Sequence, residues 1–93
     1  MKRFHLSARV SSSSPDAVEP VLRKLFAGGS VRKEGAELVV EAEIEGTGAK
    51  DLNRSLLSAL RRTEKRTRLR AEWTSDGTTE RYFDYVLKKT TRV

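Results

Sequence analysis

Cysteine is absent from the 93-residue chain, and histidine occurs once, at His5. The absence of cysteine excludes disulfides, thiolate metal ligands and thiol nucleophiles, and it indicates a reducing compartment, for which the cytoplasm is the default. No apolar run approaches the roughly 18 residues that span a bilayer, and no signal-peptide apolar region follows residues 1–3. We therefore expect a cytoplasmic protein that is neither inserted into a membrane nor exported.

Residues suited to catalysis or metal binding are also few. His5 stands in an alternating strand pattern, where we expect a partly exposed structural residue rather than a general base. Glu41, Glu43 and Glu45 occupy alternate positions, as on the outer face of a half-buried strand, whereas metal sites draw ligands from several elements. No serine lies in a nucleophile-elbow motif. The sequence thus predicts no catalytic residue, no metal site and no cofactor, and it identifies no small-molecule substrate.

Glycine-rich phosphate loops are represented only by two short segments. Residues 46–48 precede a predicted helix whose first amides could hold an anion, with Thr47 as a candidate N-cap. Gly28 and Gly29 suit the end of a helix. Neither segment matches a P-loop or a dinucleotide-binding fingerprint, so we expect turns at both places and keep a weak phosphate contact at residues 46–48 as an alternative.

Alternating and helical patterns of apolar residues predict seven elements in the order β-α-β-β-α-β-β. We expect strands near residues 4–10, 31–33, 38–44, 69–73 and 80–87, and helices from residue 15 to the Gly28-Gly29 pair and over residues 49–66. Pro20 lies beyond the first turn of the first helix and should kink that helix or delay its start, because proline lacks the amide that the helix needs.

These elements fit one α+β domain over residues 1–93, with residues 88–93 as a flexible basic tail. Hydrophobic residues make up 37% of the chain and charged residues 34%, so we expect a thin core between two layers. The expected architecture is a two-layer sandwich, an antiparallel sheet with both helices on one face. It corresponds to a ferredoxin-like split βαβ unit with an added hairpin strand.

The C-terminal hairpin can form in two registers. A two-residue loop at residues 76–77 would place Phe83 and Tyr85 on the arginine-bearing face of the preceding strand, where they could stack on single-stranded bases. A three-residue loop at residues 75–77 would turn Phe83 and Tyr85 into the core and leave Tyr82 outside. We favour the three-residue loop, because a thin core needs those aromatics.

Positive charge is concentrated in the second half of the chain. Residues 1–46 carry seven Lys or Arg and seven Asp or Glu, whereas residues 47–93 carry twelve and six. Winding the second helix at about 100° per residue gathers several of these cations opposite its apolar stripe, without the glutamates that a solvated face usually carries four residues away. The predicted nucleic-acid contacts are Lys50, Arg54, Arg61, Arg62, Lys65, Arg66, Arg68 and Arg70. Nothing in this pattern indicates base-specific recognition, and a solvated helix face is the alternative.

The region from about Phe4 to Arg66 combines a strand, a helix, a hairpin whose second strand runs over residues 37–44, and a helix with a leucine and serine pattern over residues 51–61. In these features it resembles the small dimerising subunit of the KEOPS tRNA-modification complex. That family tends to have arginine directly after the helix leucine, whereas this chain has Asn53 and then Arg54, and the hairpin from Leu69 onward is additional. The resemblance implies a non-catalytic, dimeric accessory protein that helps to hold tRNA and a catalytic partner.

Two functions from different classes follow from the sequence. The first is a non-catalytic accessory domain that binds RNA, with tRNA as the candidate, through the basic face of the second helix. The second is a protein-interaction or oligomerisation module without nucleic-acid binding, which would use an exposed edge strand or the aromatic hairpin to pair with another protein or as a homodimer.

Overall fold

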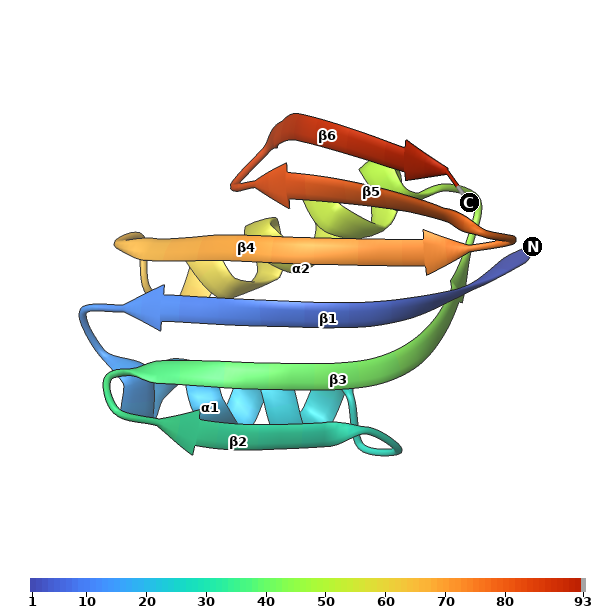
Figure 1. Cartoon of the computed structure of the whole chain (residues 1–93). Helices are drawn as coiled ribbons and strands as arrows, with labels where there is room; N and C mark the ends of the chain where they lie inside the picture. Colours follow the sequence, from blue (N-terminus) through green and yellow to red (C-terminus); the bar gives the residue numbers. More distant parts are fainter. Residues whose placement is uncertain (93) are drawn as a thin grey trace.

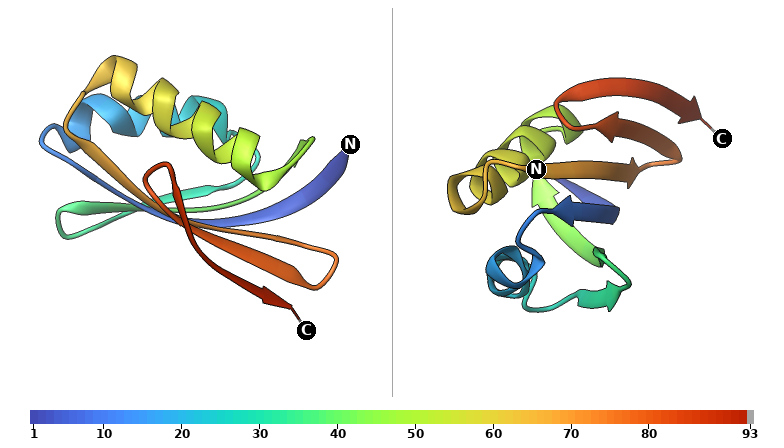
Figure 2. Two further views of the ribbon diagram at one scale, coloured as in Figure 1. Left: turned by 90° about the horizontal axis from the view of Figure 1, so that it is seen from above. Right: turned by 90° about the vertical axis from the view of Figure 1, so that its left-hand side faces the viewer.

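The computed structural model describes residues 1–92 and shows an α+β fold with a six-stranded antiparallel sheet and two helices (Figure 1). Along the chain the elements are β1 (Lys2–Ser12), α1 (Pro15–Leu25), β2 (Ser30–Glu34), β3 (Glu37–Gly46), α2 (Ala49–Thr63), β4 (Thr67–Ser75), β5 (Thr78–Phe83) and β6 (Val86–Arg92). The strands lie in the order β2-β3-β1-β4-β5-β6. Both helices cover the same face of the sheet (Figure 2), and we call the opposite face the open face.

The strand count differs from the expectation, because the strand predicted over residues 80–87 is divided into two. β5 ends at Phe83, a turn at Asp84 and Tyr85 follows, and β6 pairs antiparallel with β5. Asp84 adopts a left-handed backbone conformation, with φ 54°, which allows the reversal without a glycine. Residues 88–92, which we predicted as part of a tail, belong to β6, while residue 93 lies outside the described residues. Since all residues of β6 are exposed, no apolar alternation marked this strand in the sequence.

The core forms where alternate strand residues meet the apolar stripes of the two helices. Its strand members include Phe4, Leu6, Ala8 and Val10 of β1, Leu38, Val40 and Ala42 of β3, and Leu69, Ala71 and Trp73 of β4. Val18 and Leu22 of α1 and Leu56, Leu57 and Leu60 of α2 pack against them. Because successive strand residues point to opposite faces, the charged residues between these positions lie on the open face.

Helix α1 begins with proline in its first turn and continues through Pro20 to Leu25. Phe26, with φ −119° and ψ 47°, is the C-cap, and its amide donates the last helical hydrogen bond to the carbonyl of Leu22 at 2.9 Å. The helix therefore ends before the glycine pair that was expected to end it. A Cβ atom on Gly29 would lie 2.6 Å from the carbonyl oxygen of Glu41 in β3. Glycine at this position therefore permits the close approach of the α1–β2 connection to the sheet.

The favoured three-residue loop between β4 and β5 is wrong, because the structure has the two-residue loop. Asp76 and Gly77 both have positive φ, 51° and 76°, as in the turns that match the twist of a hairpin. Tyr82 consequently lies opposite Ala71 and is 3% exposed, whereas Phe83 lies on the open face. Burial and a hydrogen bond to Glu80 raise the pKa of Tyr82 to about 12. The hairpin register therefore follows the conformational preference of the Asp76-Gly77 turn and not the expected demand of the core for aromatic residues.

No helix within the described part of the chain combines the length and apolar character needed to cross a bilayer.

Candidate nucleic-acid interface

The eight predicted cations lie in three places rather than on one surface. Lys50, Arg54 and Arg61 lie on a flank of α2; Arg62, Lys65 and Arg66 lie around its C-terminal end; Arg68 and Arg70 lie on the open face. The last two alternate with buried Leu69 and Ala71, so their side chains point away from the helices. Helix flank and helix end remain on the same side of the molecule, whereas the two arginines of β4 face the opposite side.

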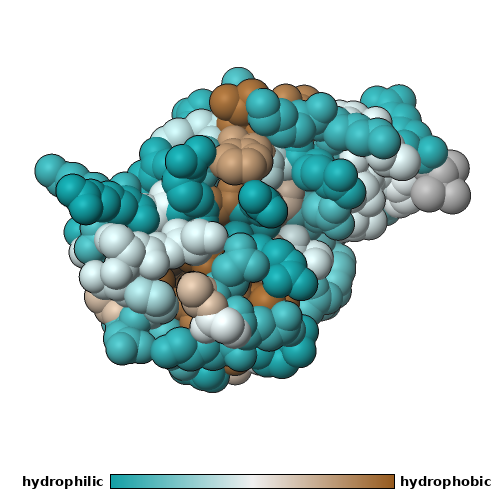
Figure 3. All heavy atoms as spheres, turned by 60° about the vertical axis from the view of Figure 1, so that its left-hand side comes forward, coloured by the Kyte–Doolittle hydropathy of each residue, from teal (hydrophilic) through white to brown (hydrophobic). Residues whose placement is uncertain are grey.

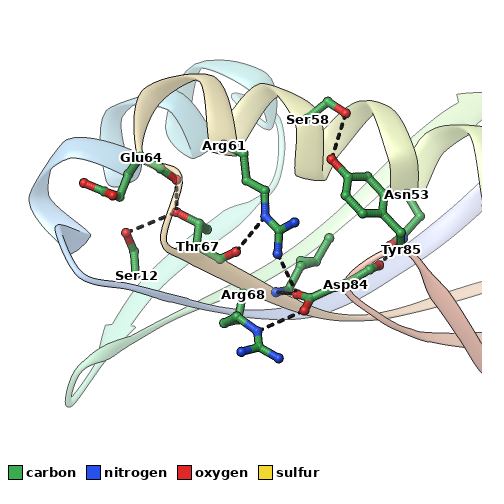
Figure 4. Close-up of polar contacts among 10 residues, drawn as sticks. Ser12, Asn53, Ser58, Arg61, Glu64, Thr67, Arg68, Asp84 and Tyr85 are labelled. Atoms are coloured by element: carbon green, nitrogen blue, oxygen red, sulfur yellow. Dashed lines mark hydrogen bonds and ion pairs between the residues drawn. The ribbon is translucent and has the colours of Figure 1, made fainter.

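Arg61 and Arg68 are engaged by the fold, because both contact the carboxylate of Asp84 in the β5–β6 turn (Figure 4). Arg68 Nε donates to Asp84 Oδ2 at 2.9 Å, and an Arg61 terminal nitrogen lies 3.6 Å from Oδ1. The amide of Leu69 donates to Oδ1 at 2.9 Å, and Arg61 Nε donates to the carbonyl of Thr67 at 3.0 Å. These two arginines therefore join α2, β4 and the turn, and their charge is partly neutralised by Asp84.

Asn53 completes this network from inside the protein. Its side chain is 1% exposed, and its Nδ2 donates to the carbonyl of Asp84 at 2.7 Å while its Oδ1 accepts from Trp73 Nε1 at 3.2 Å. The amide of Asp84 donates in turn to the carbonyl of Leu69 at 2.7 Å. We call this cluster the Asp84 junction; its members are Asn53, Arg61, Arg68, Asp84 and Tyr85.

Sequence reasoning named Tyr85 as a stacking residue in one hairpin register, but it did not predict the contact of Tyr85 with α2. The two-residue register placed Tyr85 on the arginine-bearing face and the three-residue register placed it in the core. In the structure its hydroxyl hydrogen-bonds with that of Ser58 at 3.1 Å, and the Arg61 guanidinium lies 5.3 Å from its ring centroid (Figure 4). The ring borders a hollow of about 300 Å³ on the α2 flank, together with Lys50 and Arg54. The one available signal was Asp84, a residue type that tolerates left-handed turns, inside an otherwise aromatic strand.

Six of the eight predicted cations have no carboxylate within ion-pair distance among residues 1–92: Lys50, Arg54, Arg62, Lys65 and Arg66 on the α2 side, and Arg70 on the open face. The one acidic residue of α2, Asp51, accepts a hydrogen bond from the hydroxyl of Thr47 at 3.1 Å. Glu64 is the acid within the basic block, and the amide of Arg66, which donates to it at 3.1 Å, lowers the pKa of its carboxyl. Positive charge on the α2 side is thus largely uncompensated.

The open face is also charged, but its cations are mostly paired. Arg9 lies 3.3 Å from Glu37, and Arg81 lies 2.6 Å from Glu72. Arg70 is an exception, since its guanidinium stands 5.3 Å from the ring centroid of Phe83. Figure 3 shows one side of the molecule on which hydrophilic surface predominates and apolar atoms form only small areas.

His5 lies on the open face between two carboxylates. Its Nε2 is 3.1 Å from Glu41 Oε1, and its Nδ1 contacts the carboxylate of Glu43. The hydrogen bond to Glu43, reinforced by Glu41, raises the pKa of His5, while the hydroxyl of Ser7 and then His5 lower the pKa of Glu41. Both ring nitrogens are occupied by neighbours. Within residues 1–92 no group of three or more His, Cys, Asp or Glu is arranged to hold a metal ion.

Residues 46–48 connect β3 to α2 as expected, but the predicted N-cap, Thr47, is wrong. Gly48, with extended backbone, is the N-cap of α2, and its carbonyl accepts from the amide of Leu52 at 3.1 Å. The Thr47 hydroxyl donates to Asp51 instead of accepting from a helix amide. A carboxylate in the first turn repels phosphate at this helix end.

Comparison of the chain with protein-family models, with curated proteins and with solved structures gives no match.

Proposed function

We propose that this protein is a non-catalytic accessory domain that binds RNA through the cations of the α2 side. The observation that carries the proposal is the group of five cations on the flank and end of α2 that lack carboxylate partners among the described residues. Unpaired lysines and arginines can each take a phosphate and release its counterion without first breaking an ion pair. The paired cations of the open face lack this advantage.

The cations without partners on the α2 side and the two arginines that contact Asp84 take different parts in the proposal. Lys50 and Arg54 on the flank, with the cations around the helix end, contact phosphates of one strand. A hollow of about 510 Å³ at the helix end, lined by Arg62, Lys65 and Arg66, provides room for a phosphate group. Arg61 and Arg68, which already contact Asp84, hold the surface in shape.

We also propose that β1 to β4 with the two helices form a ferredoxin-like unit, to which β5 and β6 are added. The sheet order β2-β3-β1-β4 and the placement of both helices on one face support this arrangement. On this fold, the resemblance to the small KEOPS subunit makes tRNA the proposed RNA, with a cytoplasmic location and a dimeric state as part of the same proposal.

The test of RNA binding compares charge reversals on the two sides of the molecule. For R54E/K65E we expect roughly a hundredfold weaker binding of a structured RNA, and a salt dependence shallower by about one unit of slope per lost phosphate contact. The control R3E/R32E makes the same change in net charge on strands β1 and β2, where Arg32 pairs with Glu34, and should bind nearly as wild type. Equal losses in both variants, or binding indifferent to salt, would refute the assignment to α2.

A second candidate function is favoured by β6, which is an edge strand with every residue exposed, including Val86 at 56% and Leu87 at 47%. An edge of this kind can accept a strand from another protein or from a second copy of this chain. Sedimentation with and without RNA distinguishes the two functions. A salt-resistant dimer that does not bind RNA would favour the interaction module.

A further inference from the structure

The β5–β6 turn is held against α2 more firmly than a two-residue connection requires. Asp84 has a left-handed backbone, which few residue types other than glycine adopt at low cost. Its amide, its carbonyl and its carboxylate are all engaged, with Leu69, Asn53 and Arg68 respectively. An exposed hairpin turn needs none of these bonds to reverse the chain. Their combined effect is to set the position of the next residue, Tyr85.

Tyr85 is held at its hydroxyl and on one side of its ring, and it remains partly exposed. The hydroxyl is bonded to Ser58 on α2 and the Arg61 guanidinium lies against the ring, yet the residue is 44% exposed. The other tyrosine of the hairpin, Tyr82, is 3% exposed and belongs to the core. Tyr85 therefore contributes little to the core, and a rigid, half-exposed ring costs little additional ordering when a flat partner binds to it.

The surroundings of the ring match one particular partner. Tyr85 lines a hollow of about 300 Å³ together with Lys50, Arg54 and Ser58, and neither of the two cations has a carboxylate partner among residues 1–92. An aromatic ring beside free cations is the combination that binds an unpaired base and the phosphate next to it. Bases within a duplex are stacked on each other and cannot reach such a ring.

We infer that Tyr85 is a stacking platform for an unpaired base, and that the RNA bound on the α2 flank is single-stranded where it crosses this hollow. The inference rests on the proposed function, since Lys50 and Arg54 supply the phosphate contacts on either side of the stacked base. It adds the class of ligand: an exposed base in a loop or single strand, in preference to a continuous helix. Stacking on a tyrosine is tolerant of base identity, so no strict sequence preference is expected.

The experiment measures binding of two RNAs, an unstructured oligonucleotide of about ten nucleotides and a blunt duplex of the same composition. Wild type should bind the single strand more tightly. We expect Y85A to weaken single-strand binding roughly tenfold and to leave duplex binding unchanged, because only the stacked base is lost. Y85F removes the bond to Ser58 and keeps the aromatic face, so it should bind as wild type. Y85L occupies a similar position without an aromatic face, and it replaces Y85A in the experiment if Y85A is poorly folded.

The outcomes separate this inference from the proposed function. If R54E/K65E weakens binding of both RNAs while Y85A and Y85L bind the single strand as wild type does, the stacking inference is wrong and phosphate binding stands. If R54E/K65E has no effect on either RNA, the proposed function falls, and this inference falls with it. A wild-type preference for the duplex would also overturn the single-strand assignment. Nuclear magnetic resonance gives an independent readout, since stacking should shift the Tyr85 ring protons upfield when the single strand is added.

Discussion

The Asp84 junction and the open face of the sheet both contain arginine–carboxylate pairs, but these pairs differ in their exposure to solvent. In the junction the Asp84 side chain is 17% exposed and contacts groups from α2 and β4. On the open face, Arg3 and Glu45 are 68% and 60% exposed, and the partners are on neighbouring strands. Loss of a partner leaves an unsatisfied group in the junction, whereas water replaces the partner on the open face.

This difference distinguishes the charged residues that stabilise the fold from the cations that are free to bind a ligand. Carboxylates on the open face neutralise many of its cations at small gain in stability. Asp84 contacts Arg61 of α2 and Arg68 of β4 and so attaches the last hairpin to both elements. The remaining cations of the α2 side are left without partners in the described chain, and they carry the proposed function. The net charge of the chain alone does not distinguish the cations paired on the open face, the arginines that contact Asp84 and the cations without partners.

The largest effect on stability is expected for Asn53→Ala. The substitution leaves Trp73 Nε1 and the Asp84 carbonyl without partners and should lower the free energy of unfolding by about 3 kcal/mol, since each unsatisfied buried group costs about 1–3 kcal/mol. Urea denaturation followed by the fluorescence of Trp73 measures it. Ser55→Ala, at an exposed position of the same helix, is the control and should lie within about 0.5 kcal/mol of wild type. An Asn53→Ala protein as stable as this control would show that the junction does not hold the fold.

A smaller loss is expected for Asp84→Ala, about 2 kcal/mol, because the Leu69 amide loses its acceptor and a left-handed position receives a less tolerant residue. Asp84→Asn keeps an acceptor oxygen and the tolerance for this backbone, and should lose about 1 kcal/mol. Thermal unfolding by circular dichroism compares the two. Equal losses would mean that charge, rather than backbone geometry, dominates at this turn.

The corresponding pair on the open face, Arg81 and Glu72, should be worth less than about 1 kcal/mol. A double-mutant cycle with alanine at both positions measures the coupling, and raising the salt concentration should reduce it further because both side chains are solvated. A coupling as large as the effect of Asp84→Ala would contradict the proposed contrast between the two regions.

The smallest effect concerns pH and His5, which is 47% exposed. The carboxylates of Glu43 and Glu41 raise the pKa of His5 above the ordinary value of 6.5, so its charged form stabilises the folded chain. This contribution is fully present below pH 6.5 and is lost as the pH rises through the folded-state pKa. The difference in unfolding free energy between wild type and His5→Gln should therefore decline over that range, by less than about 1 kcal/mol. If this difference instead increased with pH, the neutral form of His5, and not the charged form, would stabilise the folded chain.

The fold class and most elements followed from patterns that depend on near neighbours in the chain. The alternation of Phe4, Leu6, Ala8 and Val10 predicted strand β1. The apolar stripe of α2 predicted its start at Ala49, but the predicted end at residue 66 lies beyond the observed end at Thr63. β6 could not be found in this way, because an exposed edge strand has no buried face to impose alternation. The hairpin register was misjudged because core volume was weighed above the twist preference of the Asp76-Gly77 turn.

The sequence by itself determined the composition of the basic region and the absence of cysteine chemistry, since both are properties of the residues alone. Only the tertiary structure decided which cations are free, because pairing depends on residues far apart in the chain. Arg68 meets Asp84 across an interval of 16 residues, and Tyr85 reaches Ser58 across 27. These contacts follow from one backbone reversal at Asp84, which the neighbouring residues allow but do not specify.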